Sequence, residues 1–230
     1  MADTWRFEGL DEVVLEERPR LASWDAMASP AQAALRAYLD RLQSAADRPD
    51  LSAFHLIVGD VTEGSPGHDL DNFLYPVAKR FGANRFDLVR GSKRRSRGHR
   101  LVVGVAVSGD PPRASDGWSS VVVGTEGSTD SRAWKEDVHA QVARVVHTPE
   151  TGPVEMEIVF RIGPSRTWVN LWKPAIDSLG PILGEGRRPF MPEDDMIVEL
   201  GLHRQVDPGM GFRVELGIWG RAASGTGLIG

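Results

Sequence analysis

The sequence predicts an α+β fold made of two copies of one module. Apolar residues at helical spacing alternate along the chain with strand-length apolar runs. The order of these segments in the first half recurs in the second half. The chain has 230 residues, 41% of them hydrophobic and 26% charged, which is the composition of a globular protein. Two modules of roughly 100 residues each fit this length.

The first half contains two helix signals and two strand signals. Ser29 and Pro30 suit the N-cap and the first helical position, and apolar residues then recur at helical spacing. Asp69 and Asn72 follow a turn-rich stretch, where either can cap a second helix that ends at Gly82. The predicted elements are a helix over 30–45, a strand over 54–61, a helix from 69 to 82 and a strand over 100–107.

The second half repeats this order. Aligning Asn72 with Asn170 places Pro76 on Pro174 and keeps the apolar positions in step, which favours an internal duplication. Two similar units without common ancestry are the alternative. The predicted elements are strands over 118–123, 154–162, 196–202 and 212–219, and helices over 131–146 and 170–180. The expected modules span 1–112 and 113–220, and 221–230 is expected to be a mobile tail.

Several classes of site and location are excluded or disfavoured by composition. The chain has no cysteine, which excludes disulfides, thiolate zinc sites, iron–sulfur clusters and cysteine nucleophiles. Its six histidines form no HExxH motif or i, i+4 pair, so they predict no zinc site. Residues 1–10 lack the apolar core of a signal sequence, so we expect a cytoplasmic protein. The apolar runs fall below the ~20 residues needed to cross a bilayer, so no membrane partner is expected.

One stretch of the chain is strongly basic. The net charge of −5 argues mildly against nucleic acid as a partner, but residues 85–100 contain a single acid, Asp87, among many cations. This stretch predicts a loop that binds DNA phosphates, with a solvated loop without a partner as the alternative. The candidate DNA-binding residues are Arg90, Lys93, Arg94, Arg95, Arg97 and Arg100.

Two groups of carboxylates are candidate metal ligands. Asp69 and Asp71 are two residues apart, so both can point to one side of an extended segment. Asp194 and Asp195 open a later strand and could add a third carboxylate. Two or three carboxylates suffice for Mg²⁺, which keeps several of its waters. The alternative is that the first pair forms a helix cap with an Asx-turn and the second pair is solvated.

The first half carries the front of a known motif. RusA-like Holliday-junction resolvases have an Asp-x-Asp-Asn signature, a lysine three residues after the Asn, and an Asp-Asp pair that opens a later strand. Asp69-Leu70-Asp71-Asn72 is similar to that signature, but Tyr75 stands where the lysine belongs. The resemblance of residues 30–108 to the family is therefore weak.

The second half carries the back of the same motif. Asn170 is followed by Lys173, and Asp194-Asp195 leads into a strand, whereas Thr167 and Val169 replace the two first aspartates. The helix that begins at Ser131 also resembles the family. Residues 118–220 therefore carry the better part of the resemblance. Each half therefore contains the part of the motif that the other half lacks.

The resemblance implies an endonuclease that cuts branched DNA with Mg²⁺ or Mn²⁺. The family works as a homodimer, so two fused modules imply an intramolecular pseudo-dimer with one composite site. Lys173 would stabilise charge on the scissile phosphate or orient the attacking water. A single site can only nick, so paired cuts would require two chains to associate. The implied catalytic residues are Asp69, Asp71, Asp195 and Lys173, and the implied metal ligands are Asp69, Asp71, Asp194 and Asp195.

Two alternatives to this enzyme remain open. One is a catalytically degenerate relative that binds DNA or a protein, and the other is a different metal-dependent enzyme that uses the same carboxylates. The deciding feature is geometric. Carboxyl groups of Asp69, Asp71 and Asp195 within reach of one metal ion would favour the nuclease, and carboxyl groups on opposite faces would favour the binding protein.

Overall fold

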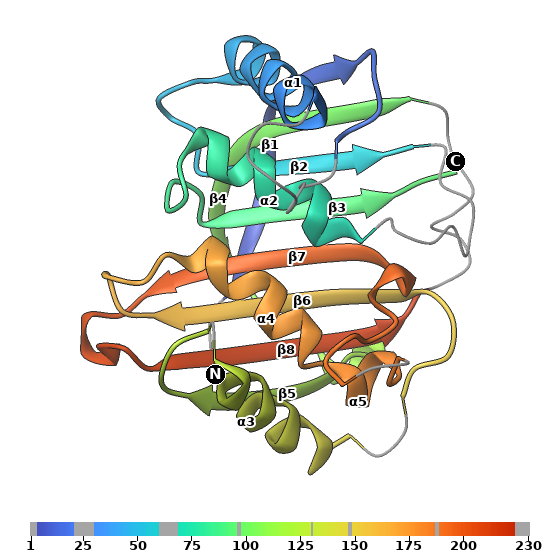
Figure 1. Cartoon of the computed structure of the whole chain (residues 1–230), viewed down its shortest axis with the longest axis vertical. Helices are drawn as coiled ribbons and strands as arrows, with labels where there is room; N and C mark the ends of the chain where they lie inside the picture. The colour runs from blue at the N-terminus through green and yellow to red at the C-terminus, as the bar shows by residue number, and fades with distance from the viewer. Residues whose placement is uncertain are drawn as a thin grey trace.

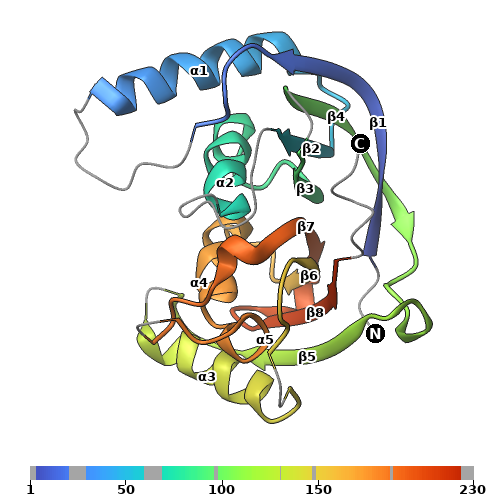
Figure 2. The same cartoon turned by 90° about the vertical axis from the view of Figure 1, so that its right-hand side faces the viewer.

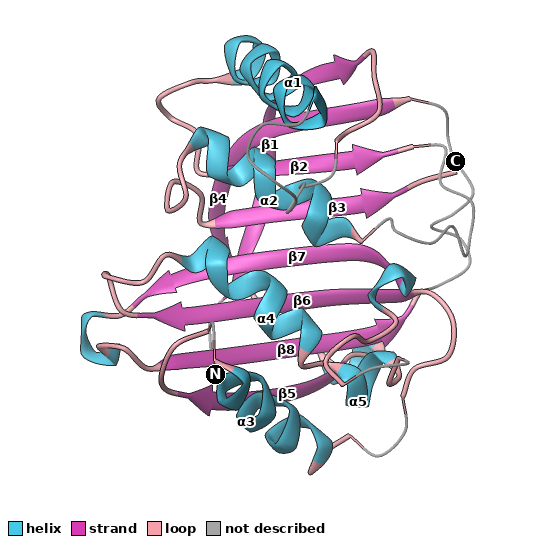
Figure 3. Ribbon diagram, viewed as in Figure 1, coloured by secondary structure: helices cyan, strands magenta, loops and turns pink. Residues whose placement is uncertain are grey.

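The computed structural model describes residues 4–20, 30–59, 69–95, 98–129, 131–146, 149–186 and 189–223. In these residues eight strands form one mixed sheet with helices on one face, which is the predicted α+β class (Figure 1 and Figure 3). The strands are β1 (Thr4–Leu15), β2 (Ala53–Val58), β3 (Leu88–Lys93), β4 (His99–Gly109), β5 (Ser119–Thr125), β6 (Val154–Ile162), β7 (Ile197–Val206) and β8 (Val214–Ala222). The α-helices are α1 (Pro30–Ala46), α2 (Leu70–Phe81), α3 (Arg132–Ala143), α4 (Trp172–Asp177) and α5 (Gly180–Leu183). Short 3₁₀ turns span Ala114–Asp116, Trp168–Leu171, Asp194–Met196 and Pro208–Met210.

The strand order is β1-β4-β2-β3-β7-β6-β8-β5. β2 and β3 are parallel, as are β6 and β7, and every other neighbouring pair is antiparallel. Read from either edge towards the centre, each half contributes its first, fourth, second and third strand. The two halves therefore have the same pairing pattern, and they meet at the antiparallel pair β3·β7.

The core lies between the sheet and its helices. α2 buries Leu70, Phe73, Leu74 and Val77, which recur at helical spacing and pack on β3. Gly91 of β3 permits this close approach, because a Cβ at that position would lie 3.1 Å from the Leu74 side chain. α2 is thereby held over the central strands, which fixes where its first residues lie.

α3 and α4 cover the second half of the sheet in a similar way. Trp134, Val138 and Val142 on α3 are buried four residues apart. Trp168 and Trp172 are fully buried and meet edge to face, with ring centroids 4.8 Å apart. The two tryptophans beside the predicted motif are therefore core residues and do not offer a face for a base to stack on.

The strand β1 has no counterpart among the predicted elements. It pairs with β4 from Thr4 to Leu15, although most of its side chains are exposed and residues 1–10 read only as polar. Its start also reaches β7, because the Trp5 backbone N–H donates to His203 Nδ1 at 3.0 Å. Figure 2 shows the helices on one side of the sheet and the strands β1 and β4 curving away from them. Because β1 buries so few of its side chains, it lacks the apolar alternation by which a half-buried strand is recognised in a sequence.

The predicted basic loop is wrong as a single loop. β3 (Leu88–Lys93) lies inside residues 85–100 and forms the centre of the sheet, and β4 begins at His99. The predicted tail is wrong at its start, because Arg221 and Ala222 complete β8. The remainder of that tail from 224 onward, Ser29 and Arg97 all lie outside the described residues.

The single helix expected over 170–180 is instead a 3₁₀ turn followed by α4 and α5. Pro181 explains the break, because it has no N–H to donate to the carbonyl of Asp177 and α5 begins beside it at Gly180. In the part of the chain that is described, no helix combines the length and apolarity needed to span a bilayer.

Candidate metal centre

Three carboxylates from distant parts of the sequence meet at the N-terminus of α2. Asp69 occupies the N-cap position with extended backbone, Asp71 lies in the first turn, and Asp194 begins the 3₁₀ turn that leads into β7. One oxygen from each lies within 4.8 Å of the others, so the three side chains could hold a metal ion. No other such group of three acidic or histidine side chains occurs among the described residues.

Lys173 on α4 joins these carboxylates. Its Nζ lies 2.8 Å from Asp194 Oδ2, 3.2 Å from Asp177 Oδ1 and 3.8 Å from Asp71 Oδ2. Asp177 follows Lys173 by four residues, so both side chains leave the same face of α4. Lys135 of α3 binds the other oxygen of Asp177 at 2.6 Å. Lys173 from the second half therefore forms an ion pair with Asp71 from the first half.

A second lysine approaches from the sheet. Lys93 ends β3, is buried, and donates a hydrogen bond to the backbone oxygen of Asp195. This bond connects the central strand of the first half to the turn that carries Asp194. It fixes the turn beside α2, and it explains how two halves of the chain build one cluster.

Asp195 has a different place from the one expected. We expected it to supply the third catalytic carboxylate, but the residue that clusters with Asp69 and Asp71 is its neighbour Asp194. Successive side chains in a 3₁₀ turn point about 120° apart, so only one of two adjacent aspartates can face the cluster. Asp195 contributes its backbone carbonyl to Lys93 instead.

Burial shapes the ionisation of the cluster. It raises the pKa of Asp71 to about 7, although Lys173 acts in the opposite direction. Burial, reinforced by the charge of Asp194, also raises the pKa of Asp69. Burial disfavours the charge of Lys173, but Asp71, Asp194 and Asp177 outweigh it and raise the pKa of that ammonium. Burial therefore disfavours the ionised forms of Asp69 and Asp71, and a bound cation would stabilise those ionised forms.

The donor set fits a hard divalent cation. Mg²⁺ and Mn²⁺ prefer oxygen ligands, and Mg²⁺ commonly binds one or two carboxylates while it keeps several waters. The three carboxylates supply only oxygen ligands. Asn72 donates from Nδ2 to Asp69 Oδ2 at 2.9 Å, which orients one of the ligands.

The position related to this cluster by the repeated topology contains no equivalent. Val169 is buried, and Thr167 and Val169 offer no carboxylate. Tyr75, which aligns with Lys173, donates from its hydroxyl to Asn170 Oδ1 at 3.4 Å. One composite cluster is therefore present among the described residues, on the side where Asp69 and Asp71 lie.

The basic residues expected to bind DNA are dispersed. Arg90 forms an ion pair with Glu157 at 2.8 Å, and Arg94 forms one with Glu199. The more exposed Arg100 lies 3.7 Å from Glu12. Arg95 is exposed and follows the end of β3 by two residues, while Lys93, the last residue of β3, is buried. Nothing in these contacts tests DNA binding, which stays a prediction.

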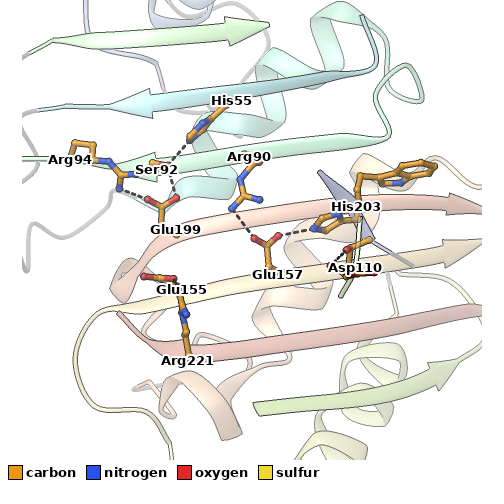
Figure 4. A network of polar contacts seen from close by, with 12 residues as sticks. His55, Arg90, Ser92, Arg94, Asp110, Glu155, Glu157, Glu199, His203 and Arg221 are labelled. Atoms are coloured by element: carbon orange, nitrogen blue, oxygen red, sulfur yellow. Dashed lines mark hydrogen bonds and ion pairs between the residues drawn. The ribbon is translucent and has the colours of Figure 1, made fainter. Parts of the chain in front are cut away.

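The opposite face of β3·β7 carries a second network of charges, shown in Figure 4. Glu157 of β6 accepts from Arg90 Nη2 at 2.8 Å and lies 2.7 Å from His203 Nε2. Ser92 donates to Glu199 Oε2 at 2.6 Å and lies 2.5 Å from His55 Nε2. A cavity of about 420 Å³ opens on this face beside His55, Arg90, Glu157 and His203. It is separated from the three carboxylates by the sheet.

Sequence reasoning missed this network, although a signal was present. Glu155 and Glu157 alternate with apolar residues in β6, and Arg90 and Ser92 alternate in β3. Residues two apart in a strand share a face, so a charged face could be read from β6. The acidic partners of the β3 residues come from other strands, and no local sequence pattern predicts them.

The chain matches no protein-family model, and no curated protein is significantly similar to it in sequence.

Proposed function

We propose that this protein is a Mg²⁺-dependent endodeoxyribonuclease of the RusA-like resolvase type that acts on branched DNA at one composite site. The observation that carries the proposal is the meeting of Asp69 and Asp71 from the first half with Asp194 and Lys173 from the second half. These residues belong to the two complementary motif fragments that resemble the family. Mn²⁺ would substitute for Mg²⁺ at such a site.

We infer that the two halves form an intramolecular pseudo-dimer with modules at 1–112 and 113–220. The support is the repeated pairing pattern on either side of β3·β7. In this arrangement Lys93 of one module holds the turn of the other, next to Asp194. A chain with a single site would nick one strand, so opposed cuts would come from two chains bound to one branched DNA.

The chain's own groups have separate tasks in this proposal. A divalent cation at Asp69, Asp71 and Asp194 would polarise the scissile phosphate and lower the pKa of a bound water. Lys173 lies within 4 Å of two of these carboxylates, so its ammonium can stabilise negative charge that develops on phosphate oxygens. Asn72 orients Asp69.

DNA is the partner that the surroundings of the cluster favour. Lys93, the last residue of β3, reaches the turn that carries Asp194, and Arg95 follows it by two residues. Arg95 is exposed there, and phosphate neutralisation by such residues supplies much of the affinity of proteins for DNA. A branched substrate is favoured by the resemblance alone.

The test is a cleavage assay on a four-way junction, a simpler branched DNA and a linear duplex, each with Mg²⁺ or Mn²⁺. We expect the intact protein to cut a branched substrate, and Asp71→Asn and Asp194→Asn to lose cleavage by at least about 100-fold, because each removes a ligand charge while keeping size. Asp195→Asn is the matched control, since its carboxylate lies outside the cluster. Absence of cleavage by the intact protein under all these conditions would contradict the proposal.

A second candidate is a degenerate relative that binds DNA or a protein without cutting. One observation favours this candidate: the Lys173 ammonium lies 2.8 Å from Asp194, so it can balance the charge of that carboxylate without a metal ion. DNA binding that is unaffected by Mg²⁺, together with no measurable Mn²⁺ affinity in calorimetry, would select this candidate. Measurable Mn²⁺ binding that disappears in Asp194→Asn would select the metal-dependent enzyme.

A further inference from the structure

Lys173 lies between two groups of carboxylates. On one side are Asp194 at 2.8 Å and Asp71 at 3.8 Å, both members of the metal-capable cluster. On the other side is Asp177 at 3.2 Å, which is outside that cluster. A metal ion and the Lys173 ammonium would therefore compete for the carboxylates of Asp194 and Asp71.

We propose that Asp177 is a positioning residue that receives Lys173 when a divalent cation binds. In the metal-loaded protein the ammonium leaves Asp194 and keeps its ion pair with Asp177. The ammonium then no longer occupies oxygens that the cation needs, and it stays beside the cluster. This inference rests on the proposed metal-dependent function of the site.

The geometry of α4 suits Asp177 to this role. Asp177 follows Lys173 by four residues on one helix face, so the exchange needs only side-chain rotation and no movement of the backbone. Lys135 binds Asp177 Oδ2 at 2.6 Å, which leaves Oδ1 facing Lys173. Asp177 is also buried, so its attraction for the ammonium is weakly screened by water.

The alternative positions for Lys173 are less suitable. Asp71 and Asp194 would both be occupied by the cation, and two positive charges that share one carboxylate oxygen repel each other strongly. The aligned position in the first half has Lys79 in place of Asp177 and Tyr75 in place of Lys173, so that half lacks both partners of the exchange. An Asp–Lys pair with a second lysine behind it is specific to the half that completes the cluster.

The test is a double-mutant cycle on Mn²⁺ affinity, measured by isothermal titration calorimetry on the full chain. The variants are Asp177→Asn, Lys173→Met and the double substitution. We expect Asp177→Asn to weaken Mn²⁺ binding by about tenfold when Lys173 is present, because the ammonium then stays on Asp194. In the Lys173→Met background the same substitution should change the affinity by no more than about twofold. Lys173→Met alone should strengthen Mn²⁺ binding, because it removes the competing cation.

Asp177→Glu serves as the conservative variant. It keeps a carboxylate on the same face of α4, so it should restore most of the affinity lost in Asp177→Asn, and thermal unfolding of each variant verifies that it is folded. An equal effect of Asp177→Asn in both backgrounds would overturn the inference while leaving the metal site in place. Absence of Mn²⁺ binding by the unsubstituted protein would overturn the inference and the proposed function together.

Discussion

The two faces of the central strand pair β3·β7 carry charges that are organised in opposite ways. On the face without helices, each buried carboxylate has a cationic or hydrogen-bonding partner, as Glu157 has with Arg90 and His203. Under the helices, Asp69, Asp71 and Asp194 meet around the ammonium of Lys173, and the buried Lys93 approaches the same cluster from the sheet. The first face is electrostatically satisfied by the protein itself, whereas on the second face burial raises the pKa of Asp69 and Asp71 despite the nearby lysines.

The same difference appears in the pKa of the carboxyl groups on the two faces. Burial acts to raise the pKa of Glu157, but Arg90 and the hydrogen bond from His203 outweigh it and lower that pKa to about 2. In the cluster the balance is reversed, and burial raises the pKa of Asp71 to about 7. A cation bound beside a buried acid whose pKa is raised would offset the cost of burying its charge, whereas an acid whose pKa is lowered is already paired.

The largest expected effect concerns the satisfied face. Glu157→Ala should lower the free energy of unfolding by about 3–5 kcal/mol, because the buried His203 and the half-buried Arg90 would both lose their acidic partner. Chemical denaturation followed by circular dichroism measures the change. The exposed pair Arg6–Glu8 is the control, where Glu8→Ala should cost no more than about 1 kcal/mol. Equal losses in the two variants would remove the distinction between the faces.

The next effect concerns the unsatisfied face. Asp194→Asn should weaken Mn²⁺ binding by about 100-fold, because it removes one of three ligand charges. Its unfolding free energy should change little, since Lys173 retains Asp177 and Asp71. Calorimetric titration measures the affinity, and Asp195→Asn should stay within about threefold of the unsubstituted protein. A greater loss in Asp195→Asn than in Asp194→Asn would show that the neighbouring aspartate is the ligand.

The pH dependence of metal binding should follow Asp71. A metal ligand must be ionised, and burial raises the pKa of Asp71 to about 7 in the metal-free protein. Mn²⁺ affinity should therefore increase by about tenfold per pH unit from pH 5.5 to pH 6.5 and level off above pH 7. Titrations at five pH values test this slope. A flat profile would mean that the proton on Asp71 does not compete with the cation.

A smaller effect is expected on metal-free stability. Because the pKa of Asp71 in the folded protein lies above its value of 3.8 in the unfolded chain, the folded protein binds the extra proton and loses stability as pH rises through about 7. Asp71→Asn cannot ionise, so its stability relative to the unsubstituted protein should increase by about 3 kcal/mol as the pH rises from 5 to 8. Thermal unfolding with chelator present measures the difference. A stability gain in Asp71→Asn that is larger at pH 5 than at pH 8 would show that the pKa of Asp71 is not raised in the folded protein.

The smallest effect should appear at the edge of the cluster. If Arg95 contacts a DNA phosphate, Arg95→Ala should reduce the slope of log affinity against log salt by about 0.9. Arg94→Ala is the comparison, and it should act mainly on stability because Arg94 pairs with Glu199. Fluorescence anisotropy with labelled DNA at several salt concentrations measures both slopes. An unchanged slope in Arg95→Ala would leave this residue without a role in DNA binding.

The sequence by itself determined the elements whose local signals are strong. The strand over 154–162 has the predicted bounds, and α1 and α2 lie within a few residues of the predicted helices, because burial of a periodic apolar face fixes each of them. The two motif fragments also placed Asp69, Asp71 and Lys173 in one candidate set.

Only the tertiary structure decided which carboxylates meet and which basic residues are already paired. Asp194 and Asp195 are equivalent in a linear motif, and the hydrogen bond from Lys93 to the turn selects which of them faces α2. Arg90 and Arg94 read as loop residues until β3 brings them beside Glu157 and Glu199 from strands more than 60 residues away. The physical reason is that the local spacing of apolar residues determines helices and strands. The pairing of buried charges instead depends on side chains that the sheet brings together across β3·β7, where its two halves meet.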